Sequence, residues 1–292
     1  MSALYQLATP LPETERNTRL YRGELIIFRG FDAMVQLTDQ LRAHCIRYFG
    51  SDPTQVHHTM SSSEIEQANE ALRTVIRKDS NVDLAWRQVL SAIHTDLDET
   101  YGDSMVIRVQ PPRSGAQGER TQPLCAHRDT WGSNLPAQVN WWAPLYETTP
   151  ERTLAIFPGF FARTVENNSA DWNFQEMVQA HRTKSAPGYP LLPTATEAPN
   201  WDDALVVSLL PGDLLCFSGA HLHASVPNTT SLTRLSFETR TVNRRDMAAG
   251  SGAPNVDGSA PFMTAQIFRN LISGQKLGEL DRISEANAGK NG

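Results

Sequence analysis

Three side chains of this sequence have the types and spacing of a ligand set for a mononuclear ferrous ion. His127 and Asp129 make a His-x-Asp pair, and His223 follows much later in the chain. Two imidazoles and one carboxylate hold Fe(II) on one face and leave the other positions open to further ligands. Because residues i and i+2 of an extended strand point to the same side, His127 and Asp129 can bind one ion together. The pattern predicts a metal site that joins two distant segments.

A second His-x-Asp pair shows that the motif alone is a weak signal. His94 and Asp96 lie in a stretch whose apolar residues have helical spacing, which predicts a helix over 81–99. Helical residues two positions apart point about 200° away from each other. We therefore expect these two side chains to lie on a solvated face and not to chelate a metal.

Two histidines compete for the role of distal ligand. His221 and His223 would point to the same side of a strand, so the alternation of side chains does not decide between them. A turn at 212–213 and a strand over 214–217 precede the strand predicted over 221–226. This arrangement places His223 well inside the second strand. It favours His223 as the ligand and gives His221 a hydrogen bond in the pocket or the core.

The segment around His223 resembles the phytanoyl-CoA hydroxylase-like branch of the Fe(II)/2-oxoglutarate oxygenases. That family has a Gly-Asp turn, a short apolar strand, His-(Gly/Ala)-Ser, a Pro-Asn or similar pair, and then an Arg. This chain has Gly-Asp at 212–213, His-Ala-Ser at 223–225, Pro-Asn at 227–228 and then Arg234. The resemblance implies that Arg234 pairs with the 5-carboxylate of 2-oxoglutarate, because a guanidinium fits a carboxylate with two hydrogen bonds. It also implies that Ser225 makes a second carboxylate contact.

The resemblance extends upstream and covers roughly residues 100–242. The His-x-Asp of the family matches His127 and Asp129, so the implied iron ligands are these two residues and His223. The family also carries a Trp near the cosubstrate on the following strand, and Trp142 matches it best after a short gap. Related halogenases have Gly or Ala where this chain has Asp129, so the resemblance implies oxygenation and not chlorination.

One further serine is a candidate for cosubstrate binding. Arg234 and Ser236 have the Arg-x-Ser form that another branch of these oxygenases uses. The two residues would share a strand face, so Ser225 and Ser236 both remain candidates. No motif points to coenzyme A or to a long acyl chain, so the name of the family does not identify the substrate.

The resemblance implies a reaction class. Fe(II), 2-oxoglutarate and O₂ would oxidise a small molecule, most simply by hydroxylation, with release of succinate and CO₂. Desaturation and ring closure remain open, and a role in specialised metabolism fits the size of the chain. One alternative is a jelly-roll protein that binds a metal or ligand without redox turnover. Another is a cupin-like enzyme such as an isomerase, which would recruit more histidines, among them His221.

Many short predicted strands that follow a group of helices predict a β-sandwich or a jelly roll. The resemblance implies a mainly β fold with a double-stranded β-helix (jelly-roll) core and flanking helices. We expect a single domain over 1–292, with helical support over 1–102, the core over 103–242 and a C-terminal loop and helix over 243–292. The predicted strands are 105–110, 124–127, 138–145, 153–157, 205–209, 214–217, 221–226 and 232–242, after a first strand at 25–28. The predicted helices are 32–49, one that begins near Ser63 with Glu66 at capping-box spacing, 81–99 and 263–274.

Composition narrows the possible partners and the compartment. The net charge is −6 and no basic run could follow a phosphate backbone, so nucleic acid is not an expected partner. The three cysteines are odd in number and far apart, which indicates a reducing cytoplasm and no disulfide framework. The first residues lack the apolar core of a signal peptide, and no apolar run is long enough for a membrane span. We expect a cytoplasmic protein that binds a small molecule.

Overall fold

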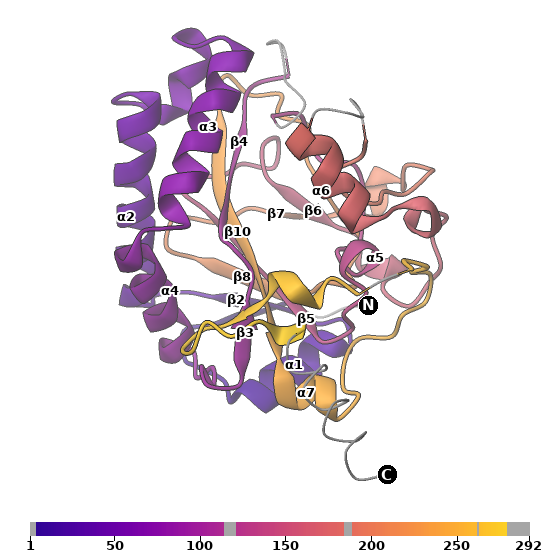
Figure 1. Cartoon of the computed structure of the whole chain (residues 1–292). Coiled ribbons are helices and arrows are strands. Elements are labelled where there is room, and N and C mark those ends of the chain that lie inside the picture. The colour runs from indigo at the N-terminus through magenta and orange to yellow at the C-terminus, as the bar shows by residue number, and fades with distance from the viewer. Residues whose placement is uncertain (1–3, 114–120, 184–188, 262, 279–292) are drawn as a thin grey trace.

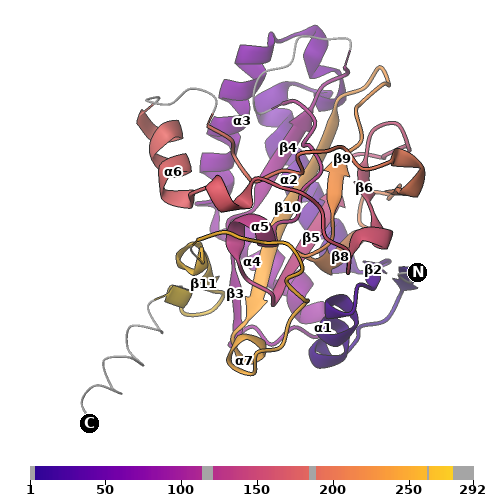
Figure 2. The ribbon, with the colours of Figure 1, turned by 90° about the vertical axis from the view of Figure 1, so that its right-hand side faces the viewer.

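The computed structural model describes residues 4–113, 121–183, 189–261 and 263–278. Helices from the first third of the chain cover one side of a large β-sheet, and a small sheet lies on the other side (Figures 1 and 2). The α-helices are α1 (Glu13–Tyr21), α2 (Asp32–Phe49), α3 (Ser62–Ile76), α4 (Ser80–Ala92), α5 (Thr130–Ser133), α6 (Phe174–Thr183) and α7 (Arg244–Ala248). The 3-10 helices are η1 (Pro53–His58), η2 (Pro158–Phe160), η3 (Ser169–Asp171), η4 (Trp201–Asp203) and η5 (Ala265–Ile267).

The two sheets are almost wholly antiparallel, and only β1 and β2 pair in parallel. The large sheet has the order β1 (Leu4–Leu7), β2 (Leu25–Phe28), β8 (Leu214–Ser218), β5 (Gln138–Pro144), β10 (Arg234–Asn243), β3 (Thr100–Gly102) and β11 (Arg269–Asn270), and β4 (Val106–Gln110) also pairs with β10. The small sheet has the order β7 (Leu205–Val207), β6 (Leu154–Ile156) and β9 (His223–Ser225). The long strand β10 therefore lies in the middle of the large sheet.

Two apolar cores hold these layers together. The larger core joins α2, α3 and α4 to the sheet and contains Leu37, Leu72 and Val89 together with Ile107 and Phe237. The second core lies between the sheets and contains residues of both, namely Ile27, Trp142, Leu154, Val207 and Phe217. Burial of apolar surface on both faces makes the large sheet the central layer of the molecule.

Strand alternation gives β10 two different faces. Leu235 and Phe237 are buried in the core beneath the helices. Arg234, Glu238 and Arg240 point the other way and line a cavity. Successive side chains of a strand point to opposite faces, so one strand contributes apolar residues to the core and charged residues to the cavity.

Several predicted elements end or begin elsewhere in the structure. Residues 124–127 run beside β9 and hydrogen bond to it, but only His127 forms a bridge, with His223, and no strand forms there. The helix predicted over 81–99 ends at Ala92, because Ile93 leaves the helical conformation and His94 has a left-handed φ of 62°. Both residues of this second His-x-Asp therefore lie after the end of α4 and outside any helix. Asp96 forms an ion pair with Arg245.

The start of α3 and the C-terminal segment also differ from the prediction. The capping box of α3 is formed by Ser61 and Glu64, two residues before the predicted pair, and it adds half a turn of helix. The helix predicted over 263–274 does not form. The segment folds as η5 and β11. The side chain of Asn270 accepts hydrogen bonds from two backbone amides. The segment then turns at Gly274, which has a φ of 71°. In the described residues, no helix has both the length and the apolarity to cross a membrane.

Candidate metal centre

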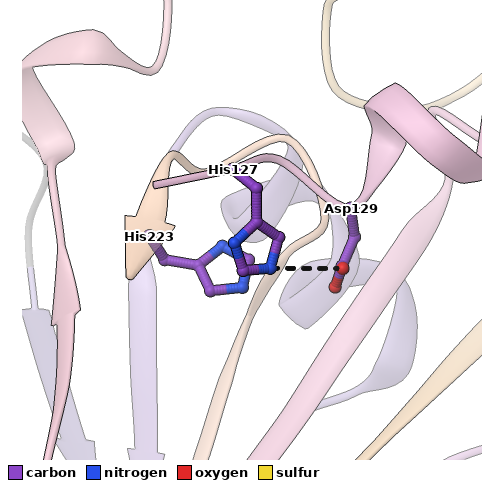
Figure 3. Close-up of side chains that lie close together, drawn as sticks. All are labelled: His127, Asp129 and His223. Atoms are coloured by element: carbon purple, nitrogen blue, oxygen red, sulfur yellow. Dashed lines mark ion pairs between the residues drawn. The ribbon is translucent and has the colours of Figure 1, made fainter. Parts of the chain in front are cut away.

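The three predicted ligands meet at one point. One ligand atom from each of His127, Asp129 and His223 lies within 4.8 Å of the other two. The two imidazole rings have centroids 4.2 Å apart, and His127 Nε2 lies 3.8 Å from Asp129 Oδ1. Figure 3 shows the rings side by side with the carboxylate facing them. Asp129 lies directly before α5, and the bridge between His127 and β9 brings the two segments together.

Backbone carbonyl oxygens orient both imidazoles. His127 Nδ1 lies 2.7 Å from the carbonyl oxygen of Cys125, and His223 Nδ1 lies 2.9 Å from that of His221. A carbonyl oxygen only accepts hydrogen bonds, so Nδ1 carries the proton and Nε2 keeps its lone pair. Burial, and then the charge of the neighbouring His223, lower the pKa of His127 to about 4. The neutral form that binds a metal is therefore the form present at neutral pH.

Two groups hold the carboxylate of Asp129. Asn140 donates a short hydrogen bond from Nδ2 to Asp129 Oδ2, and Asn140 Oδ1 accepts one of 2.8 Å from Gln138 Nε2. The guanidinium of Arg240 lies 3.9 Å from the other carboxylate oxygen. Burial acts to raise the pKa of Asp129, but the charge of Arg240, the neighbouring imidazoles and the hydrogen bond from Asn140 outweigh it, and the pKa is lowered. The carboxylate is thus ionised and oriented before a metal binds.

The structure places His221 away from this group. Its ring is fully buried, with Nε2 3.1 Å from the carbonyl oxygen of Gly23 and Nδ1 3.2 Å from that of Ser218. Both ring nitrogens therefore face protein oxygens. Burial lowers the pKa of His221 to about 4, so the ring is neutral and its single N–H donates to one of these two carbonyl oxygens.

Arg234 is a buried cation that lacks a carboxylate partner. Its Nη1 donates to the carbonyl oxygen of Thr153 at 2.6 Å and its Nη2 to Ser225 Oγ at 3.4 Å, while Nε is buried without a hydrogen bond. Among the described residues, no carboxylate lies within ion-pair distance of it. Burial, and then the charge of Arg108, lower its pKa to about 9. A buried cation without a counter-charge is costly, which fits a site for a bound carboxylate.

The other two cosubstrate candidates differ in their surroundings. Trp142 is buried on β5, packs in the core between the sheets and lines the cavity. Ser236 is fully buried and its hydroxyl has no hydrogen-bond partner. Ser225 both contacts Arg234 and lines the cavity, whereas Ser236 is not among the lining residues. The geometry therefore gives Ser225 the better position of the two serines.

A cavity of about 320 Å³ connects these groups. The predicted metal ligands, Arg234 and Trp142 all contribute to its wall. A volume of this size lies in the range of small-molecule sites. The cavity can therefore bring a cosubstrate between the guanidinium and the three ligands.

Comparison with known proteins gives a match only at the level of structure. No family model and no curated protein matches the chain. EvdO2 from Micromonospora carbonacea var. aurantiaca is 14% identical, with a TM-score of 0.50 over 82% of this chain and 93% of EvdO2. The chain has the fold of EvdO2.

Other similar structures have lower scores. The non-haem α-ketoglutarate-dependent carbocyclase SnoK from nogalamycin biosynthesis is 15% identical, with a TM-score of 0.43 over 89% of this chain and 98% of SnoK. The epimerase SnoN, solved with Fe³⁺, α-ketoglutarate and nogalamycin RO, is 15% identical, with a TM-score of 0.43 over 88% of this chain and 98% of SnoN. EvdO2 has also been solved with 2-oxoglutarate.

The sequence analysis missed part of the cavity wall. Glu238 and Arg240 lie on the same face of β10 as Arg234, so the alternation of that strand could have identified them. An apolar wall comes from the segment 159–204, which had no assigned structure because it lacks a regular period. This wall contains Trp172, Phe174, Met177, Leu191, Leu192 and Pro193.

Proposed function

We propose that the protein is an Fe(II)- and 2-oxoglutarate-dependent oxygenase that oxidises a small molecule. The observation that carries this proposal is the convergence of His127, Asp129 and His223 at a cavity that also contains the buried guanidinium of Arg234. A protein that binds a metal without turnover needs the three ligands. It does not need a buried guanidinium beside them that could bind the carboxylate of a cosubstrate.

The donor set fits a ferrous ion. Two imidazoles whose Nε2 atoms face the third ligand and one carboxylate are the facial triad of non-haem iron oxygenases. Asn140 and Arg240 hold Asp129 in place, and the backbone holds His127 and His223. Such outer contacts orient ligands and raise their affinity for the metal.

Arg234 and Ser225 would hold the far carboxylate of 2-oxoglutarate. The unpaired Nε of Arg234 and the adjacent Ser225 hydroxyl are the hydrogen-bonding groups available there. When bound, iron and 2-oxoglutarate supply the activation of O₂ that oxidises the substrate and releases succinate and CO₂. Trp142 would form part of the cavity wall beside the bound cosubstrate.

Finer assignments belong to the same proposal. The fold shared with EvdO2 supports a jelly-roll core over 103–242 within a single domain. The motif around His223 supports the phytanoyl-CoA hydroxylase-like branch, with hydroxylation as the simplest outcome and specialised metabolism as the setting. Asp129 supports oxygenation, because a carboxylate at this residue would serve as the third protein ligand where related halogenases have Gly or Ala and leave room for a halide.

Two measurements test the proposal. The protein with Fe(II), ascorbate and 2-oxoglutarate should release succinate slowly even without its substrate. Calorimetry without O₂ should show that Arg234→Leu weakens 2-oxoglutarate binding about tenfold or more, because a charge-assisted pair is lost. Arg245→Leu, at a side chain that is 68% exposed, is the matched control and should bind normally. No succinate from the wild-type protein, or normal binding by Arg234→Leu, would contradict the proposal.

A further inference from the structure

A carboxylate points into the cavity beside the candidate metal centre. Glu238 lies on β10, where its Cα partners are Trp142 on β5 and Val106 on β4. Its side chain is 35% accessible and lines the cavity, whereas most residues of β10 are buried. The accessible surface of Glu238 therefore faces whatever the cavity holds.

Arg108 fixes one oxygen of this carboxylate. The guanidinium donates a short hydrogen bond from Nη2 to Glu238 Oε1, and the Arg108 side chain is only 12% accessible. Burial acts to raise the pKa of Glu238, but the charge and hydrogen bond of Arg108 outweigh it, so the pKa is lowered. Glu238 is thus an ionised and rigidly held group.

The second oxygen of Glu238 is left available. In the described part of the chain, no hydrogen bond reaches Oε2. An ionised carboxylate is only an acceptor, so a molecule bound against Oε2 must supply a hydrogen-bond donor. A ligand without a donor would leave this oxygen desolvated and unpaired, which is unfavourable.

The charges around Glu238 indicate that this donor is uncharged. Glu238 is neutralised by Arg108, and Arg240 lies next to it in an ion pair with Asp103 at 2.5 Å. Because these charges already neutralise one another, an ammonium group at Oε2 would lose its hydration without gaining an unpaired counter-charge, and a carboxylate would be repelled by Glu238. A hydroxyl group meets neither repulsion.

Another part of the cavity wall is apolar. Trp172 and Phe174 precede and begin α6, Met177 follows within that helix, and Leu192 and Pro193 come from the segment after it. Apolar side chains favour a body with little polar surface, and the volume of about 320 Å³ limits that body to a few rings beside a cosubstrate.

We propose that the substrate is an uncharged alcohol with an apolar, ring-sized body whose hydroxyl group donates to Glu238 Oε2. The inference rests on the proposed function and names its class of substrate. Glu238 is then the residue that selects the donor, and Arg108 is the residue that positions Glu238. The hydroxyl group and the apolar wall together determine which part of the body faces the metal ligands.

Four compounds that share one cage test this preference. The probes are 1-adamantanol, its methyl ether, 1-adamantanamine and adamantane-1-carboxylate, titrated calorimetrically into the protein with Fe(II) and 2-oxoglutarate in the absence of O₂. We expect the alcohol to bind about tenfold or more tightly than the ether, because a hydrogen bond to a charged acceptor is lost in the ether. We also expect it to bind more tightly than the amine and the carboxylate.

Variants of Glu238 assign the preference to this side chain. Glu238→Leu should abolish the difference between alcohol and ether, and Glu238→Gln should keep part of it because an amide oxygen still accepts. Since Glu238→Leu leaves Arg108 unpaired, the double variant Arg108→Met/Glu238→Leu provides a second test in a neutral background. Glu147→Leu, at an exposed glutamate, is the matched control and should keep the wild-type preference.

The outcomes distinguish a failure of the proposed substrate class from a failure of the proposed oxygenase function. The alcohol assignment is overturned if the alcohol and the ether bind equally, if no probe binds, or if the amine or the carboxylate binds more tightly. It is also overturned if both leucine variants keep the wild-type preference. Binding of Fe(II) and 2-oxoglutarate is measured first in the same protein. If both bind while the probe preference is absent, only the substrate class fails; if 2-oxoglutarate does not bind, the oxygenase proposal fails with it.

Discussion

Arg128 and Asp257 form a buried ion pair, with Arg128 Nε 3.1 Å from Asp257 Oδ2. Arg128 lies between the predicted ligands His127 and Asp129, while Asp257 belongs to the glycine-, alanine- and proline-rich segment over 249–261 that follows α7. Asp257 Oδ1 also accepts a 2.6 Å hydrogen bond from the indole of Trp131 in α5. The remaining donors of Arg128 bond three backbone carbonyl oxygens, those of Phe160, Arg163 and Ala220. Arg128 therefore connects the segment that carries the predicted ligands to three other segments, those around Phe160, Ala220 and Asp257.

Loss of Asp257 should destabilise the protein strongly. Asp257→Ala leaves a buried guanidinium and a buried indole N–H without their acceptor, and removal of one partner of such a pair costs about 3–5 kcal/mol. Urea denaturation measures the free energy of unfolding. Asp202→Ala, at an exposed residue, is the control and should change it by less than about 0.5 kcal/mol. Equal effects of the two substitutions would show that Asp257 is not a structural anchor.

Asn140 should determine the metal affinity through Asp129. Asn140→Leu removes the hydrogen bond that orients the carboxylate and also leaves Gln138 without its acceptor. The loss of such an outer contact weakens metal binding by about 10- to 100-fold. Equilibrium titration with Mn(II) provides the dissociation constant. Gln67→Leu, on the exposed side of α3, should bind as the wild type does, and unchanged binding by Asn140→Leu would refute the assigned role.

Substitutions of His221 and His223 should have different effects on iron binding. His223→Ala should lose tightly bound iron, because one of three ligands is removed. His221→Asn should retain it, since both ring nitrogens of His221 face carbonyl oxygens, but should unfold at a lower urea concentration. Iron content after purification and a denaturation curve test both variants. Loss of iron in His221→Asn together with retention in His223→Ala would reverse the assignment of the ligand.

His221 should also make the apoprotein sensitive to acid. Its pKa is about 4 in the folded protein, against 6.5 for an unperturbed histidine, so the unfolded chain takes up the proton first as the pH falls. Its contribution to stability is present above pH 6.5 and is lost progressively toward pH 4. Between about pH 7.5 and about pH 5.5 the loss is about 1 kcal/mol. Unfolding curves of chelator-treated wild type and His221→Gln at both pH values should differ by this amount; parallel pH dependence in the two proteins would refute it.

The sequence predicted the elements whose signals are local. The helix over 32–49 and the strand over 25–28 have the predicted bounds, because apolar spacing and Gly50 mark them clearly. The capping box of α3 illustrates the limit of a local signal. Ser61 with Glu64 and Ser63 with Glu66 have the same spacing, and the contacts of the folded helix select the first pair. Local patterns therefore predict that a helix exists more reliably than where it begins.

Long-range contacts account for what the sequence could not predict. The segment 263–274 has helical spacing, but pairing of β11 with β3 overrides it. Three ligand candidates could be named from residue type and spacing, yet the buried setting of Arg234 and the Arg108–Glu238 pair depend on strands brought together from distant parts of the chain. The sequence could not assign the cavity wall at and before α6 to regular elements, because packing and not periodicity places Trp172 and Phe174 there.

The two faces of β10 have a practical consequence for protein engineering. Residues 234, 238 and 240 meet the contents of the cavity, while Leu235 and Phe237 pack beneath the helices. Arg234 and Arg240 are assigned to the cosubstrate and to Asp129, so Glu238 is the position of these three where a substitution can change which substrate the cavity accepts. A small library that varies residues 108 and 238 together, so that neither charge is left unpaired, would sample new selectivities and leave the core beneath the helices intact.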